Sequence, residues 1–243
     1  MSSLRQAFCF LTILPIPYPQ QLQFKDLGKS ARWFPLVGLV IGLLLAGLRW
    51  VLGLIFPPLL VGILVVAAWA LLTGGLHLDG LADCGDGLLV SAAPERRLEI
   101  LKDSRLGSFG ALTLIFHLLI KVATVSLLTT PIAWFALPAA AAMGRAMLVW
   151  SATRPFARPG GMGETFANGL AKPVQWLPWV ILAVGLPMMG VGWLAIPAIL
   201  LSILLTLAIQ RMAARRLGGL TGDVLGLVVE LVETAVLLIM VIQ

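Results

Sequence analysis

Three aspartates in the segment 73–87 have the spacing of a single helical face. Asp79, Asp83 and Asp86 stand at positions i, i+4 and i+7, so in a helix they project from the same side. Like charges so close together repel unless a cation lies among them, and short aspartate side chains suit a hard cation such as Mg²⁺. The alternative is a polar loop in which Asp79 starts a helix, but capping needs one aspartate and not three. The segment therefore predicts a divalent-metal site.

A second polar group occupies residues 103–110, which read Asp-Ser-Arg-Leu-Gly-Ser-Phe-Gly. Arg105 carries a planar guanidinium that matches the oxygens of a phosphate. A structural ion pair between Arg105 and Asp103 is the alternative, and Ser108 suits the N-cap of the next helix. The group predicts a phosphate-binding corner at the mouth of a membrane span.

Two further arginines, Arg154 and Arg158, stand beside a glycine cluster at residues 160–163. This combination favours a cradle for phosphate or a nucleotide. The charge bias of loops in membrane proteins would explain the arginines equally well, though not the glycines.

The last acidic group lies in an otherwise apolar run. Asp223 is followed by Glu230 on the same helical face and by Glu233, which a rise of 1.5 Å per residue puts roughly 15 Å further on. A carboxylate at that depth costs at least about 2.5 kcal/mol unless it is paired or binds metal, so a functional site is the default expectation. Protonation, or pairing with Lys121 or Arg145 in neighbouring spans, is the alternative.

The two histidines do not make a zinc site, which needs more His or Cys ligands than the chain supplies. His117 is expected to be a hydrogen-bonded interior residue. His77 stands two residues before Asp79, where it either orients an aspartate or touches a substrate.

The elements that must position these residues are membrane helices. Of the 243 residues 60% are hydrophobic and only 12% are charged, against roughly 25% in a typical soluble domain. Such a chain has too little polar surface to cover a water-soluble core. The net charge of +6 lies in short connections between apolar runs, which indicates a membrane orientation signal and no nucleic-acid partner.

The sequence predicts an all-α polytopic bundle, a single membrane domain over residues 1–243. About seven spans are expected, with a short interfacial helix near residues 7–16; the spans are 33–56, 58–77, 108–129, 132–152, 176–191, 193–209 and 224–242. Seven spans put the long charged connections 1–32, 78–107, 153–175 and 210–223 on one face. That face is expected to be cytoplasmic, with the C-terminus outside. Gly38 and Gly42 are expected to let helices pack closely.

These motifs together resemble the cobalamin synthase family, also called adenosylcobinamide-GDP ribazoletransferases. The resemblance rests on residues 74–83 (Gly-Gly-Leu-His-Leu-Asp-Gly-Leu-Ala-Asp), 86–87 and 102–105, and on Thr-Gly-Asp at 221–223 with Glu230 and Glu233. Residues 10–17, 35–38 and 144–145 also match, so the resemblance extends from about residue 8 to about residue 235.

The resemblance implies an integral enzyme of the bacterial or archaeal cell (inner) membrane, with its active-site face in the cytoplasm. It would be Mg²⁺-dependent and act late in cobalamin biosynthesis, joining nucleotide-activated adenosylcobinamide-GDP to α-ribazole or its 5′-phosphate and releasing GMP. The protein is expected to contact membrane lipid, and the resemblance leaves open whether it forms a homo-oligomer.

The resemblance also assigns roles to residues of this sequence. The implied metal ligands are Asp79, Asp83, Asp86 and Asp103, and the implied catalytic residues are Asp83, Asp86, Asp103 and Arg105. The implied substrate-binding residues are His77, Ser104, Arg145, Arg154, Arg158, Asp223, Glu230 and Glu233.

Two other functions use similar residues. A CDP-alcohol phosphotransferase also sets aspartates around metal on membrane helices, but its pattern begins Asp-Gly-x-x-Ala-Arg, whereas Asp79-Gly-Leu-Ala is followed here by Asp83. A divalent cation transporter would fit Glu230 and Glu233 equally well. It fits Arg105 poorly, because an arginine beside the entrance would repel cations.

Overall fold

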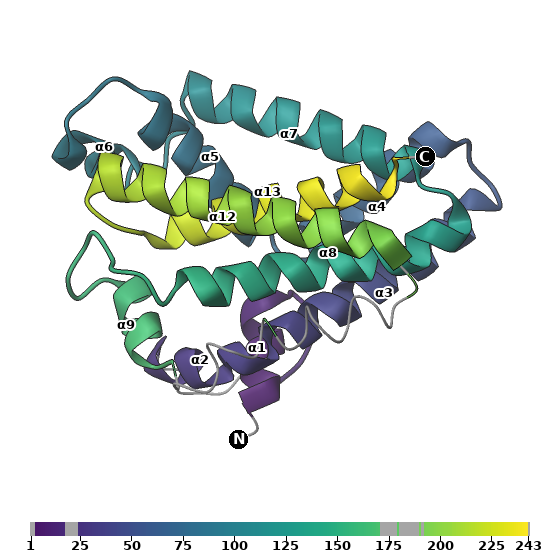
Figure 1. Ribbon diagram of the computed structural model, residues 1–243, viewed down its shortest axis with the longest axis horizontal. Helices are drawn as coiled ribbons and strands as arrows, with labels where there is room; N and C mark the ends of the chain where they lie inside the picture. Colours follow the sequence, from purple (N-terminus) through teal and green to yellow (C-terminus); the bar gives the residue numbers. More distant parts are fainter. Residues whose placement is uncertain (1–2, 18–23, 171–178, 180–189, 191, 243) are drawn as a thin grey trace.

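The computed structural model describes residues 3–17, 24–170, 179, 190 and 192–242, and over these residues the protein is built of helices (Figure 1). The α-helices are α1 (Ser3–Leu11), α2 (Phe24–Ser30), α3 (Phe34–Gly53), α4 (Pro58–Leu72), α5 (Leu76–Leu89), α6 (Pro94–Ile100), α7 (Ser108–Leu127), α8 (Thr130–Ser151), α9 (Met162–Asn168), α12 (Ala195–Leu217) and α13 (Gly222–Met240). Short 3₁₀ turns precede α3 (Ala31–Trp33) and α12 (Gly192–Leu194). The all-α prediction is confirmed for the described part of the chain.

The long helices α3, α7, α8 and α12 run along the long axis of the molecule, and the short helices α6 and α9 gather at one end of it (Figure 1). α8 and α13 form the centre, and nearly every residue of the second half of α8 is buried. α3 packs on α8, and α13 packs against α8, α5 and α12. Large apolar side chains on the outer faces of α4, α7 and α12 remain exposed, among them Leu59, Phe116 and Leu204. Such faces suit lipid.

Four described helices are long and apolar enough to cross a membrane, or five if the bent pair α4 and α5 counts as one span. The predicted count of seven spans is therefore not confirmed. The expected span 176–191 lies, apart from residues 179 and 190, outside the described residues. α13 is long enough, but the three acids in its apolar sequence set it apart from the other long helices.

The predicted span 58–77 differs from the structure, because α4 ends at Leu72 and α5 leaves it at an angle of 94°. Gly74 and Gly75 make the turn with φ angles of 61° and 68°, in the left-handed region that favours glycine. The segment expected as a long connection is thus largely helical. Its helix begins at Leu76, so Asp79 does not start it, and the three aspartates do share a helix as their spacing predicts.

Small residues bring the helices into main-chain contact. A Cβ atom built on Gly38 would lie 2.3 Å from the carbonyl oxygen of Ala141, and one on Gly42 would lie 2.3 Å from the Cα of Pro138. The prediction that these glycines serve helix packing is confirmed for α3 on α8.

Candidate active site

The crossing of α5 and α13 brings the two acidic segments together. A Cβ atom on Gly80 would lie 2.7 Å from the carbonyl oxygen of Asp223, and one on Gly226 would lie 3.1 Å from the carbonyl oxygen of His77. Each helix therefore meets the other with a glycine, and the backbones approach as closely as they can. The first turn of α13 is fixed by Thr221, whose hydroxyl accepts from the N–H of Val224 at 3.3 Å and donates to the Asp223 carboxylate at 3.1 Å.

Asp83 lies at the centre of this acidic group. It lies on α5, beyond the 94° bend. Because α5 carries three aspartates in 14 residues, we assign this helix to the charged end of the molecule, outside the apolar spans. Burial, and then the charges of Asp79, Asp223 and Asp86, raise the pKa of Asp83 to about 7. Among the described residues the carboxylates of Asp79 and Asp83 have no hydrogen-bonding or ion-pair partner. These carboxylates repel one another and would accept a cation.

Asp86 has a different set of contacts. One of its oxygens accepts the N–H of Gly107 at 2.7 Å and the other accepts the N–H of Gly110 at 2.8 Å. Gly107 is the N-cap residue of α7, so Asp86 satisfies two of the free N–H groups at the start of that helix. The predicted cap, Ser108, is instead the first residue of the helix. Asp86 therefore ties α5 to α7 and fixes the direction of the acidic face.

The substitution Gly110→Ala tests this contact. The added Cβ would lie 2.4 Å from the Asp86 carboxylate and 2.8 Å from the carbonyl oxygen of Ala82, so α5 and α7 must separate. We expect a loss of about 1–3 kcal/mol in the free energy of unfolding, measured on the protein in detergent. Gly47→Ala is the control, because a Cβ atom on Gly47 would meet only a Trp134 ring atom, 3.8 Å away in ordinary contact. Equal stability of the two variants would contradict the role given to Asp86.

Asp103 and Arg105 form an ion pair with each other. The Arg105 Nε donates to the Asp103 carboxylate at 2.9 Å and its Nη2 does so at 2.6 Å, while the Arg105 backbone N–H donates at 3.1 Å. The side-chain hydrogen bonds from Arg105 lower the pKa of Asp103 to about 2. The structural pairing weighed as the alternative is thus present, in an exposed turn that also carries Ser104.

The loop that carries Arg154 and Arg158 is tied to the start of α13. The N–H of Ala157 donates to the carbonyl oxygen of Leu220 at 2.9 Å, and the N–H of Leu220 donates to that of Pro155 at 2.9 Å. This short parallel bridge brings Arg158 near enough to Asp223 for their charges to interact. Arg158 also donates to the carbonyl oxygen of Leu98.

Arg154 behaves differently from Arg158. Its side chain is exposed, and its guanidinium lies 5.8 Å from the centre of the Trp150 ring. The structure therefore brings Arg158, but not Arg154, to the acidic group.

Glu230 and Glu233 lie in a buried cluster of ion pairs inside the bundle. The Lys121 ammonium is 2.7 Å from Glu230 and 2.6 Å from Glu233, and Arg145 pairs with the other oxygen of Glu233. His117 is 2.8 Å from Glu230, as expected for an interior hydrogen-bonded histidine. All five side chains are 5% exposed or less. Pairing with Lys121 and Arg145, the alternative left open by the sequence, is the arrangement found.

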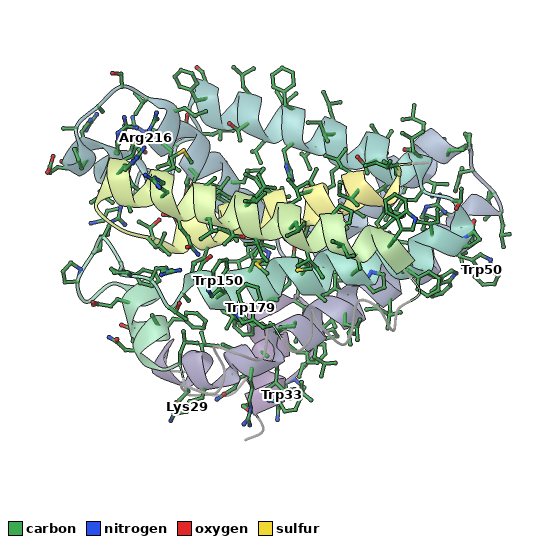
Figure 2. The ribbon with its side chains drawn as sticks, in the orientation of Figure 1. Lys29, Trp33, Trp50, Trp150, Trp179 and Arg216 are labelled. Carbon is green, nitrogen blue, oxygen red and sulfur yellow. The ribbon has the colours of Figure 1, made fainter. Side chains whose placement is uncertain are left out.

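Two arginines that the sequence did not single out hold the end of α5. Arg97 is buried and donates to the carbonyl oxygens of Gly87 at 3.1 Å, Leu88 at 2.7 Å and Ala92 at 2.8 Å. Arg216 of α12 also donates to the Leu88 carbonyl, and it lies at the end of the molecule opposite Trp50 (Figure 2). Cations suit the free carbonyls at a helix C-terminus. In the sequence both arginines look like ordinary loop charge.

A cavity of about 360 Å³ opens beside the acidic group. His77, Asp79, Gly80 and Asp223 are among its lining residues. The lining also includes three stacked aromatic rings with 5.8 Å between successive centres, those of Phe10, Phe34 and Phe166. Sequence reasoning missed this wall because its rings come from α1, α3 and α9. Among the described residues no three His, Cys, Asp or Glu side chains form a ready-made metal site.

Long apolar helices with a carboxylate-lined cavity at one end define a membrane-type helical protein with a polar functional site. A family model described as cobalamin-5-phosphate synthase matches residues 3–241. The chain belongs to this family and is an enzyme, and the resemblance read from its motifs is confirmed.

Relatives named adenosylcobinamide-GDP ribazoletransferase match over nearly their full length. The protein of Pseudomonas fluorescens is 42% identical, covering 96% of this chain and 96% of its own. The protein of Geotalea daltonii is 39% identical, covering 97% and 95%. That of Desulfitobacterium hafniense is 37% identical, covering 98% and 97%. No solved structure matches the chain.

Proposed function

We propose that this enzyme joins adenosylcobinamide-GDP to α-ribazole, or to its 5′-phosphate, and releases GMP in a late step of cobalamin biosynthesis. The observation that carries the proposal is the full-length match to relatives named for this reaction. Asp79 and Asp223 line one cavity, and Asp83 lies close enough to both for their charges to interact. This acidic group supports the proposal, because the reaction must stabilise negative charge on a pyrophosphate. The same match favours a transferase over the cation transporter and the lipid phosphotransferase.

Mg²⁺ is the proposed cofactor, and the residues present fit it by their chemistry. The group offers carboxylate oxygens, the ligands that Mg²⁺ takes, and burial together with the mutual repulsion of the carboxylates raises the pKa of Asp83. Mg²⁺ usually binds one or two carboxylates together with waters and substrate phosphates, so a complete protein cage is not required. Asp79, Asp83 and Asp223 would hold it, whereas both oxygens of Asp86 already accept backbone N–H groups and those of Asp103 accept from Arg105. Bound there, the ion would neutralise charge on the pyrophosphate.

The chemical step exchanges a phosphoanhydride bond for a phosphoester bond. The ribose hydroxyl of the acceptor attacks the phosphorus attached to cobinamide, forming a new P–O bond. The bond from that phosphorus to the bridging oxygen breaks, and GMP leaves with the oxygen and its electron pair. The hydroxyl proton passes to a carboxylate of the acidic group.

Polar residues outside the cavity lining are proposed to hold phosphate oxygens. Arg158 is the nearest of them, because it already interacts with Asp223. Arg105 and Ser104 are exposed, and they would engage the nucleotide part from the outer side. To do so, the Arg105 guanidinium would bind phosphate while it keeps its ion pair with Asp103, or in place of that pair. Arg154 lies over the Trp150 ring, apart from the acidic group, and is given no such role.

The buried acids have a supporting part in this proposal. Glu230, Glu233 and Arg145 do not line the cavity, but their ion pairs join α13 to α7 and α8. We propose that they act on substrate indirectly, by fixing the helix whose first turn carries Asp223.

The protein is proposed to lie in the cell membrane with the α5, α6 and α9 end in the cytoplasm. The exposed apolar faces and the long apolar helices support the membrane location. The arginines near α6 and the end of α12 support the orientation, since cytoplasmic loops are rich in basic residues.

Purified protein in detergent, given adenosylcobinamide-GDP and α-ribazole, is expected to release GMP in a Mg²⁺-dependent way. Chelation with EDTA should reduce the release to background, and added Mg²⁺ should restore it, because the carboxylates need a cation beside the pyrophosphate. GMP is measured by chromatography, with reactions lacking α-ribazole as the control. No release with Mg²⁺ present would exclude the proposed reaction, and equal release in EDTA would exclude the metal.

A further inference from the structure

The cavity beside the acidic group has an apolar interior and a polar mouth. Leu27 and Phe34 are 1% and 0% exposed, and the lining also includes Leu148 and Leu225, both buried. Asp79 is exposed and Asp223 is only partly buried, so the carboxylates stand toward the solvent side. A ligand that enters would place an apolar ring system deep in the cavity and a polar part near the acids.

His77 is the polar residue of the buried part. It is 2% exposed and lines the cavity, yet neither of its ring nitrogens has a hydrogen-bond partner within the described part of the chain. An unsatisfied polar group in such a place is unfavourable unless something else bonds to it. In the neutral ring one nitrogen donates and the other accepts. His77 is therefore the buried polar side chain of this cavity whose capacity to donate one hydrogen bond is unused.

Resting on the proposed function, we propose that this cavity binds the base of the acceptor nucleoside, with His77 donating to its free ring nitrogen. The base of α-ribazole is a flat, methylated benzimidazole whose second ring nitrogen is only an acceptor, so one donor satisfies it. Guanine carries a carbonyl, a ring N–H and an amino group on one edge, and these would lack partners against leucine and phenylalanine. A corrin ring is far larger than the cavity.

This position also suits the reaction. A base stacked near Phe34 and Phe166 directs its ribose toward the mouth, where Asp79 and Asp223 lie. The attacking hydroxyl is then brought to the acidic group by the same contacts that select the base. The cavity thereby acts as the specificity site for the lower base.

The test compares His77→Ala with the wild-type enzyme in detergent, using steady-state GMP release. We expect the KM for α-ribazole to rise about tenfold or more, while the KM for adenosylcobinamide-GDP changes less than about twofold. Phe116→Leu, an exposed aromatic residue of α7, is the control and should change neither. A rise in the KM for adenosylcobinamide-GDP instead would assign the cavity to the guanine and overturn the proposal, as would no change in either.

A second measurement changes the acceptor substrate and keeps the wild-type enzyme, so its result does not depend on whether a variant folds. An α-riboside of dimethylindole, with carbon in place of the free ring nitrogen, should show a KM about tenfold or more above that of α-ribazole with wild-type enzyme. With His77→Ala the two acceptors should be equivalent; equal KM values with wild-type enzyme would overturn the proposal. Absence of GMP release by wild-type enzyme with α-ribazole would instead count against the proposed reaction itself.

Discussion

Asp83→Asn is expected to lower GMP release by roughly two to three orders of magnitude, because it removes the central charge of the acidic group. Asparagine has nearly the same size, so the packing of α5 should persist. The stability of the metal-free protein should stay the same or rise, since Asp83 is repelled by Asp79, Asp223 and Asp86. The measurement is GMP release at saturating substrate, together with thermal unfolding in detergent.

Asp26→Asn serves as the matched control for this substitution. Asp26 lies on α2 in an ion pair with Lys29, and the lysine side chain is 65% exposed. Such surface pairs contribute little to stability, and Asp26 does not line the cavity. Near-normal turnover of Asp83→Asn, with a folded protein, would remove the acidic group from the mechanism.

Arg145→Met is expected to cost about 3–5 kcal/mol in the free energy of unfolding, because it leaves the Glu233 charge buried with fewer partners. The Arg145 side chain is 0% exposed and pairs with Glu233. Helix α13 should loosen, so GMP release should fall with stability. The measurement is the unfolding midpoint in detergent, with activity followed in parallel.

The double variant Arg145→Met with Glu233→Gln tests whether the loss of stability in Arg145→Met comes from an unbalanced buried charge. It removes one base and one acid, leaving Lys121 paired with Glu230, so its stability should recover part of the loss. Arg96→Met, which breaks an exposed pair with Glu99, should show little change. The argument would be contradicted if the double variant lost more free energy of unfolding than the two single variants lose together.

The helical class and the acidic face of α5 could be predicted because each depends on spacing within one segment. Apolar runs mark long helices, and the i, i+4, i+7 spacing places Asp79, Asp83 and Asp86 on one side wherever the helix packs. The bend before α5 had a local signal, the Gly74-Gly75 pair, but a glycine pair alone does not give the direction of a turn.

The partners of the interior charges could not be predicted, because spacing within a helix does not tell which helices meet. The sequence left Glu233 with several candidate roles, and only the packing of α13 on α7 and α8 selects Lys121 and Arg145. The cavity wall is a similar case, since Phe10 and Phe166 are far apart in the chain. Likewise, no pattern connects Asp86 to the amide of Gly110.

The buried ion-pair cluster has a consequence for an energised cell. Its two acids and two bases cancel while His117 is neutral, so within the proposed membrane location it carries no net charge. Moving one elementary charge across a transmembrane voltage changes its energy by about 2.3 kcal/mol per 100 mV, so a cluster of zero net charge that moves as one body gains or loses nothing. The seating of α13 on α7 and α8 is therefore expected to be the same in respiring and de-energised cells.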